Sequence, residues 1–187
     1  SEAIATEAAR LRALAAHDIR APRLLAESAG GLMFTHIGEH TLLHHIEASP
    51  ERLDYWQQGL TALAQVHRSG QYLSQAFARN IIVSDDGQIG FIDFEDDPGH
   101  YMPLERCQSR DYLCYLQSTA VWLQKHGLLD QAAAIWRQHA AGLPAALRTP
   151  IESAIRPIGW MRHLQAGFWG NDTLRLAALA ALFEQAK

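Results

Sequence analysis

Apolar residues recur every three or four positions near the start of the chain and throughout its second half. The first such stretch predicts an amphipathic helix over Glu2–His17, with Ala8, Leu11 and Leu14 on one face. A second helix is expected to begin at Ser49-Pro50-Glu51 and to end before Gly70. The later pattern predicts four more helices, with Pro157 interrupting the third: Arg110–His126, Leu129–Ala141, Pro150–Gln165 and Thr173–Ala186.

Short apolar runs around turn residues predict two β-hairpins. The first joins Arg23–Glu27 to Leu32–Ile37 through two glycines. The second joins Asn80–Val83 to Gln88–Phe94 through Ser84-Asp85-Asp86-Gly87, and Asp-Gly between β-branched runs is a strong hairpin signal. Strands precede most of the helices, so the predicted fold class is α+β.

Charge and composition exclude several classes of function. The chain of 187 residues has a formal net charge of −4, so no overall basic field favours nucleic acid. No apolar run reaches the roughly 18–20 residues of a membrane span, and the polar, acidic start lacks the pattern of a signal peptide. Cys107 and Cys114 are expected to be reduced. These features predict a cytoplasmic protein without a nucleic-acid partner or a membrane span.

Two polar residues flank the second hairpin in a pattern suited to a metal ion. Asn80 precedes Asp93 by thirteen positions, and the hairpin between them can bring both side chains to one cleft. Their oxygen atoms suit Mg²⁺, which takes one or two protein ligands and completes its shell with water and phosphate. Phosphoryl transfer then depends mainly on positioning and on charge neutralisation.

The spacing around these residues resembles that of the protein-kinase-like superfamily, nearest to the bacterial lipopolysaccharide kinases and small-molecule kinases. Leu73-Ser74-Gln75 falls on the family's His-Arg-Asp or His-Gly-Asp triplet, and Asn80 falls on its catalytic-loop asparagine. Ile92-Asp93-Phe94-Glu95 resembles the Asp-Phe-Gly motif. Asp111 matches the later aspartate that braces the catalytic loop in such folds. The resemblance implies a protein-kinase-like fold.

In this resemblance, residues 1–38 form a partial N-lobe with a helix, two strands and a hinge. Residues 39–187 form a mainly α-helical C-lobe that contains the β-hairpin catalytic region. ATP and Mg²⁺ would lie between the hinge and Asp93, with Asp93 and Asn80 as metal ligands and Glu7 paired with a lysine. The expected nucleotide-contacting hinge residues are Phe34, Thr35, His36 and Ile37.

Two departures from the family pattern bear on activity. Gln75 stands where the catalytic aspartate is expected, and an amide cannot act as a base near neutral pH. The family's glycine-rich strands and lysine are expected before the helix that carries Glu7, and neither Lys125 nor Lys187 is positioned to replace that lysine. We therefore expect the sequence to be a fragment of a longer chain.

Three functions follow as alternatives. The first is an atypical kinase in which Gln75 positions a hydroxyl of a sugar, lipid or protein acceptor. The second is a pseudokinase that retains binding and has lost chemistry. The third is a helical interaction protein without a nucleotide site, for which Asn80 and Asp93 should point away from a common cleft.

Two other polar groups have open interpretations. Glu95, Asp96 and Asp97 are interpreted as a solvated loop, with a second metal ligand or a displaced base as the alternative. The histidines that suggest zinc are interpreted instead as part of a solvent-facing segment, because the sequence has no zincin glutamate or cysteine beside them: His36, His40, His44 and His45.

Overall fold

The chain folds into α-helices and two small antiparallel sheets, which confirms the α+β class. The computed structural model describes residues 2–49, 51–164 and 169–187. The helices are α1 (Glu2–Ala15), α2 (Leu42–Ala48), α3 (Asp54–Arg68), α4 (Leu104–Lys125), α5 (Leu129–Ala141), α6 (Ala145–Ile155) and α7 (Asn171–Gln185). The strands are β1 (Leu24–Ser28), β2 (Gly31–Phe34), β3 (His40–Thr41), β4 (Ile81–Val83) and β5 (Ile89–Phe91). The 3₁₀-helices are η1 (Ala78–Asn80), η2 (Pro98–His100) and η3 (Arg156–His163).

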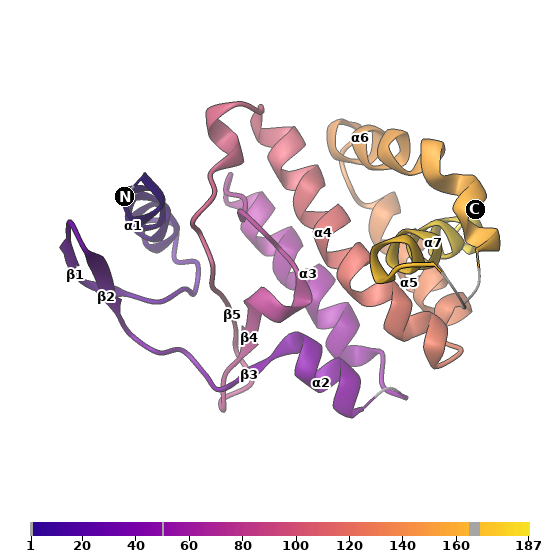
Figure 1. Ribbon diagram of the computed structural model, residues 1–187, viewed down its shortest axis with the longest axis horizontal. Coiled ribbons are helices and arrows are strands. Elements are labelled where there is room, and N and C mark those ends of the chain that lie inside the picture. The colour runs from indigo at the N-terminus through magenta and orange to yellow at the C-terminus, as the bar shows by residue number, and fades with distance from the viewer. Residues whose placement is uncertain (1, 50, 165–168) are drawn as a thin grey trace.

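The elements are arranged in three groups (Figure 1). Helix α1 and the β1–β2 hairpin lie on one side, α3, α4 and the second sheet lie in the middle, and α5–α7 lie on the other side. The second sheet has the strand order β3-β4-β5, in which Ile82 of β4 pairs with Thr41 on one side and Gly90 on the other. Within the described ranges, no helix is both long and apolar enough to cross a membrane.

Helices α3 and α4 form the centre of the core through three buried residues. Trp56 Nε1 donates to Thr119 Oγ1 at 2.9 Å, and Tyr115 Oη donates to the Trp56 carbonyl oxygen at 2.7 Å. A Cβ atom at Gly59 would lie 2.2 Å from Tyr115 Oη, so only glycine lets the two helices approach this closely. The polar atoms of these large aromatic side chains are thereby paired inside the core.

The first 38 residues pack directly on the rest of the chain. Leu11 and Leu14 of α1 belong to the same buried cluster as α3 and α4. The Phe91 backbone N–H donates to the Arg20 carbonyl oxygen at 3.0 Å, and Ser84 Oγ donates to the Ile37 carbonyl oxygen at 2.5 Å. The segments that lead into β1 and out of β2 are therefore both attached to the β4–β5 hairpin.

Several predicted boundaries are wrong. Helix α3 begins at Asp54, and Pro50 of the predicted start lies outside the described residues. Helix α4 begins at Leu104, six positions before the predicted Arg110. The helix predicted from Pro150 is instead α6 followed by η3, with Pro150 inside α6; its predicted end at Gln165 lies outside the described residues.

Candidate functional site

The side chains of Asn80 and Asp93 meet between η1 and the end of β5. Asn80 is buried, and its Nδ2 donates to Asp93 Oδ2 at 3.1 Å and to the Gln75 carbonyl oxygen at 3.0 Å. The Ile92 backbone N–H also donates to the Asn80 carbonyl oxygen at 3.0 Å. This arrangement is the opposite of the one expected for an interaction protein in which Asn80 and Asp93 point apart.

Asp93 has an unusual backbone conformation. Its φ angle is +71°, in the left-handed region that residues with a Cβ atom seldom adopt. Such residues are held by the structure around them and occur often at functional sites. The turn follows β5 directly and directs the Asp93 side chain towards Asn80.

Glu7 of α1 is brought to the same region. Burial raises the pKa of the Glu7 carboxyl group, a hydrogen bond from the Phe94 backbone N–H lowers this pKa, and the charges of Glu95 and Asp93 raise it again. Glu7 thus lies in an acidic environment.

The two lysines considered as partners of Glu7 have other neighbours. Lys125 Nζ lies 5.1 Å from the centre of the Trp122 ring, and Lys187 Nζ pairs with Glu184 Oε2 at 2.5 Å.

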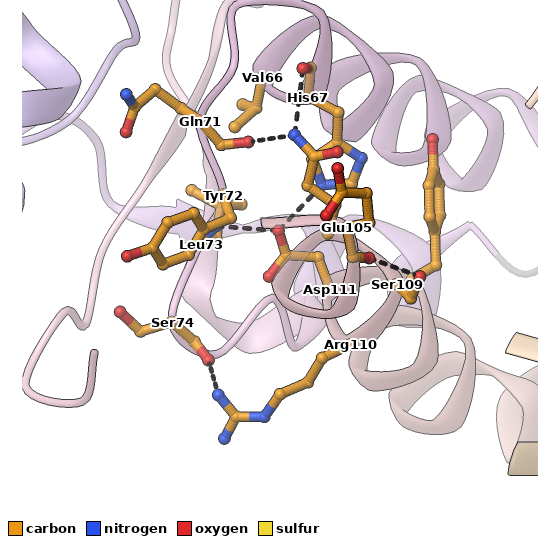
Figure 2. Close-up of polar contacts among 12 residues, drawn as sticks. Val66, His67, Gln71, Tyr72, Leu73, Ser74, Glu105, Ser109, Arg110 and Asp111 are labelled. Atoms are coloured by element: carbon orange, nitrogen blue, oxygen red, sulfur yellow. Dashed lines mark hydrogen bonds and ion pairs between the residues drawn. The ribbon is translucent and has the colours of Figure 1, made fainter. Parts of the chain in front are cut away.

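The loop before η1 is held by the backbone of three consecutive residues. The Leu73 N–H donates to Asp111 Oδ2 at 2.8 Å, and Arg110 Nη1 donates to the Ser74 carbonyl oxygen at 2.8 Å. The Gln75 carbonyl oxygen accepts from Asn80, as described above. Figure 2 shows Asp111 and Arg110 extending from α4 towards this loop. Main-chain groups at positions 73 and 74 therefore orient the loop, and within the described chain the buried Ser74 hydroxyl has no hydrogen-bond partner.

Asp111 is fully buried and contacts His67 at the end of α3. His67 Nε2 lies 2.9 Å from Asp111 Oδ2. Burial raises the pKa of the Asp111 carboxyl group, while His67, the Leu73 N–H and Arg110 all oppose this rise. Within the described chain, Asp111 Oδ1 and His67 Nδ1 are buried and have no hydrogen-bond partner. Asp111 therefore fastens α4 to both α3 and the loop.

The acidic run after Asp93 is only partly solvated. Glu95 is exposed, but Asp96 Oδ2 lies 3.2 Å from Arg110 Nη2, and Asp97 Oδ1 accepts from Tyr72 Oη at 2.5 Å. The interpretation as a solvated loop is therefore wrong for Asp96 and Asp97, which attach the run to the loop before η1. Arg110 joins the two segments, and sequence reasoning did not single it out.

Arg10 adds a contact from α1 to the same loop. Its Nη2 donates to the Tyr72 carbonyl oxygen at 2.7 Å, and its guanidinium carbon lies 4.0 Å from the centre of the Tyr72 ring. Arg10 is buried, although most arginines are exposed. Helix α1 is thus attached near both ends of the acidic run. Glu7 contacts Phe94, which precedes the run, and Arg10 contacts Tyr72, whose hydroxyl group donates to Asp97 at the end of the run.

The predicted hinge residues lie at the end of β2 and beside the β4–β5 hairpin. Phe34 ends β2 with 43% of its surface exposed, and His36 is also exposed. Thr35 Oγ1 accepts from the Arg23 backbone N–H at 2.9 Å. Ile37 lies against the β4–β5 hairpin through the bond from Ser84, and this hairpin ends next to Asp93.

The donor atoms at Asn80 and Asp93 fit a magnesium ion. The Asn80 side chain donates to Gln75 and Asp93 through Nδ2, so its carbonyl oxygen is suited to a metal, as are the Asp93 carboxylate oxygens. Elsewhere, His40 and His44 stack with ring centres 4.6 Å apart. Among the residues that the structure describes, no group of three or more His, Cys, Asp or Glu side chains is arranged to hold a metal ion.

Comparisons with protein-family models, curated proteins and solved structures find no match to this chain. The interpretation of the site therefore depends on the contacts among its own residues. These contacts bring four of the predicted residues to one region: Glu7, Asn80, Asp93 and, through its carbonyl oxygen, Gln75. The two predicted cysteine thiols are free, with Cys107 buried and Cys114 half-buried.

Proposed function

We propose that this protein is an atypical kinase-like protein that binds ATP together with Mg²⁺. The observation that carries the proposal is the contact between Asn80 Nδ2 and Asp93 Oδ2 at 3.1 Å. The left-handed backbone of Asp93 and the attachment of the loop to Asp111 support it, because both hold the site in one geometry before any ligand arrives.

The chain's own residues divide the work of binding. Asp93 and the side-chain oxygen of Asn80 would hold Mg²⁺, which supplies neutralisation of phosphate charge when it is bound. Burial and the nearby charges of Glu95 and Asp93 disfavour the ionised form of the Glu7 carboxyl group. A cation beside Glu7 would favour this ionised form again, so Glu7 is suited to pair with a cation. The ligand would meet a region that carries negative charge, and among the described residues no side-chain cation forms an ion pair with Glu7.

A catalytically inactive pseudokinase is the second candidate, and the residue that favours it is Gln75. The amide of Gln75 has no proton-accepting capacity near neutral pH, and its backbone carbonyl oxygen already accepts from Asn80. In the active alternative, Gln75 positions a sugar, lipid or protein hydroxyl and does not deprotonate it. Alignment and metal can carry most of such a reaction, because its transition state is largely dissociative.

Thermal unfolding tests nucleotide binding. We expect ATP with Mg²⁺ to raise the melting temperature of the full-length protein, and ATP with EDTA to raise it much less. Asp93→Ala should remove the metal-dependent difference, whereas Asp130→Ala at an exposed position on α5 should retain it. An equal shift with Mg²⁺ and EDTA in the parent protein would overturn the proposal.

Activity is measured separately by transfer of radiolabelled phosphate. If the parent protein transfers phosphate and Asp93→Ala abolishes the transfer, the pseudokinase candidate fails. If the parent is inactive and Gln75→Asp creates transfer, the active-enzyme candidate fails.

A further inference from the structure

A groove of about 560 Å³ opens beside the loop that carries Asn80. Its volume lies within the range of roughly 300–1,000 Å³ that is typical of small-molecule sites. Its lining includes residues from the loop, α4 and α7: Phe77, Arg79, Trp122, Lys125, Asn171 and Arg175. The groove therefore extends from η1, the element that carries Asn80, to the first turn of α7.

Arg79 is presented to this groove while its neighbour Asn80 is buried. The two residues are consecutive in η1, where successive side chains point about 120° apart. Asn80 points towards Asp93, and Arg79 is exposed with its guanidinium carbon 4.4 Å from the centre of the Phe77 ring. The Ala78 N–H donates to Ser118 Oγ at 3.0 Å, which attaches η1 to the wall formed by α4.

Lys125 forms a similar pair on α4. Its Nζ lies 5.1 Å from the centre of the Trp122 ring, and both residues line the groove. Each cation is thus held beside an aromatic face, an arrangement that orients the charge and leaves the nitrogen atoms able to bind a ligand. The same groove contains two such pairs, one on the loop and one on α4.

The charges of the groove are incompletely balanced. Arg79, Lys125 and Arg175 face Glu47 and Asp172, on a chain whose formal net charge is −4. Arg175 Nη1 lies 3.5 Å from Asp172 Oδ1. In the part of the chain that the structure describes, neither Arg79 nor Lys125 forms an ion pair with a carboxylate. Both cations are therefore available to an anion.

We propose that this groove binds the phosphoryl acceptor, and that the acceptor is a small hydroxyl compound which already carries a phosphate group. Arg79 and Lys125 bind the phosphate through charge-assisted hydrogen bonds, which are about twice as strong as neutral ones. The amide of Asn171 and the hydroxyl of Ser118, which also line the groove, bind hydroxyl groups of the acceptor. The role as acceptor rests on the proposed function, whereas the anion site does not.

The test follows binding of glycerol 3-phosphate, with glycerol as the neutral probe. In ¹⁵N-labelled protein, the indole N–H signal of Trp122, assigned through Trp122→Phe, reports binding in the groove. We expect glycerol 3-phosphate to move this signal and glycerol to leave it unchanged. Arg79→Gln and Lys125→Gln should each weaken binding about tenfold, equivalent to about 1.4 kcal/mol, because each variant loses a charge-assisted hydrogen bond to the phosphate. Arg106→Gln, at an exposed position near the start of α4, should bind as the parent does.

The outcomes separate this inference from the nucleotide proposal. Arg79→Gln and Lys125→Gln should retain the Mg²⁺-dependent thermal shift with ATP, while Asp93→Ala should lose that shift and still bind glycerol 3-phosphate. Equal binding of glycerol, or unchanged binding in both groove variants, would overturn the anion site. A shift caused by an acidic peptide but not by glycerol 3-phosphate would overturn the small-molecule class. Failure of the ATP shift alone would remove only the role as acceptor.

Discussion

Asn80 Nδ2 lies 3.1 Å from Asp93 Oδ2, and the same nitrogen lies 3.0 Å from the Gln75 carbonyl oxygen. One amide group therefore joins the loop before η1 to the turn after β5. A group that donates to two acceptors at once cannot be replaced by a carboxylate without losing both hydrogen bonds. The stability and the metal response of the protein should both depend on this single amide.

Asn80→Asp should destabilise the protein and make its stability dependent on Mg²⁺. The new carboxylate would lie about 3 Å from that of Asp93, and the repulsion between them would be relieved by a divalent cation. We expect the free energy of unfolding to fall by roughly 1–3 kcal/mol at pH 7 and to recover partly with Mg²⁺, as measured by urea denaturation. Asn80→Ala loses the donor without adding charge and is the control. An equal response of both variants to Mg²⁺ would contradict this prediction.

Asp111→Ala should cost more stability than Asp111→Asn. Alanine leaves the Leu73 N–H and His67 Nε2 without their buried partner, which we expect to cost about 3–5 kcal/mol. Asparagine retains one acceptor oxygen for the Leu73 N–H and should cost less. Urea unfolding followed by tryptophan fluorescence compares the two variants. Equal midpoints would show that this acceptor contributes little.

The contribution of Asp111 should also depend on pH. Burial raises the pKa of its carboxyl group above the ordinary 3.8, so the folded protein retains this proton at pH values where the unfolded chain has lost it. The resulting stabilisation is complete below pH 3.8 and is lost as the pH rises through the folded-state pKa. The unfolding free energy of the parent relative to Asp111→Asn should therefore fall with rising pH, by at most about 1.4 kcal/mol per pH unit. A rise instead would indicate that the ion pair with His67 outweighs burial.

Gly59→Ala should destabilise the centre of the core. The added Cβ would lie 2.2 Å from Tyr115 Oη and 2.8 Å from Leu42 Cδ2, and such overpacking typically costs about 1–3 kcal/mol. Gly159→Ala in η3 is the control, because a Cβ there meets no atom within 4 Å. We expect a lower melting temperature for Gly59→Ala alone. Equal melting temperatures would mean that α3 and α4 separate readily.

The elements that local chemistry specifies could be predicted from the sequence. Helix α5 has the predicted bounds, and β4 and β5 lie within the predicted hairpin, joined by the Ser84–Gly87 turn in which Gly87 has a φ angle of +77°. Helix α2 and strand β3 were not predicted. Strand β3 has two residues and is stabilised by pairing with β4, which lies forty positions away in the chain.

Proline was a mixed boundary signal. The predicted interruption at Pro157 is confirmed, since α6 ends at Ile155 and η3 begins at Arg156. Pro103 stands directly before α4, whose predicted start was Arg110. The sequence predicts a helix start at Pro150, yet this residue lies inside α6, where Leu147 and Ile151 are both buried. Burial of this apolar face outweighs the backbone hydrogen bond that proline removes.

The candidate site was predictable only where the chain brings its parts together locally. The Asn80–Asp93 contact follows from a hairpin between the two residues. The bridge that Arg110 makes between Ser74 and Asp96 could not be read from spacing, since it depends on where α4 crosses the loop. The partly buried state of the acidic run was missed for the same reason.

Main-chain atoms hold the loop at Leu73, Ser74 and Gln75, and this has a consequence for how the protein can vary. Each of these anchors would survive exchange of the side chain at its position, because only the peptide groups take part. The scaffold and the side chain at position 75 are therefore separable. A lineage could exchange that side chain by a single codon change while the fold around it stayed the same.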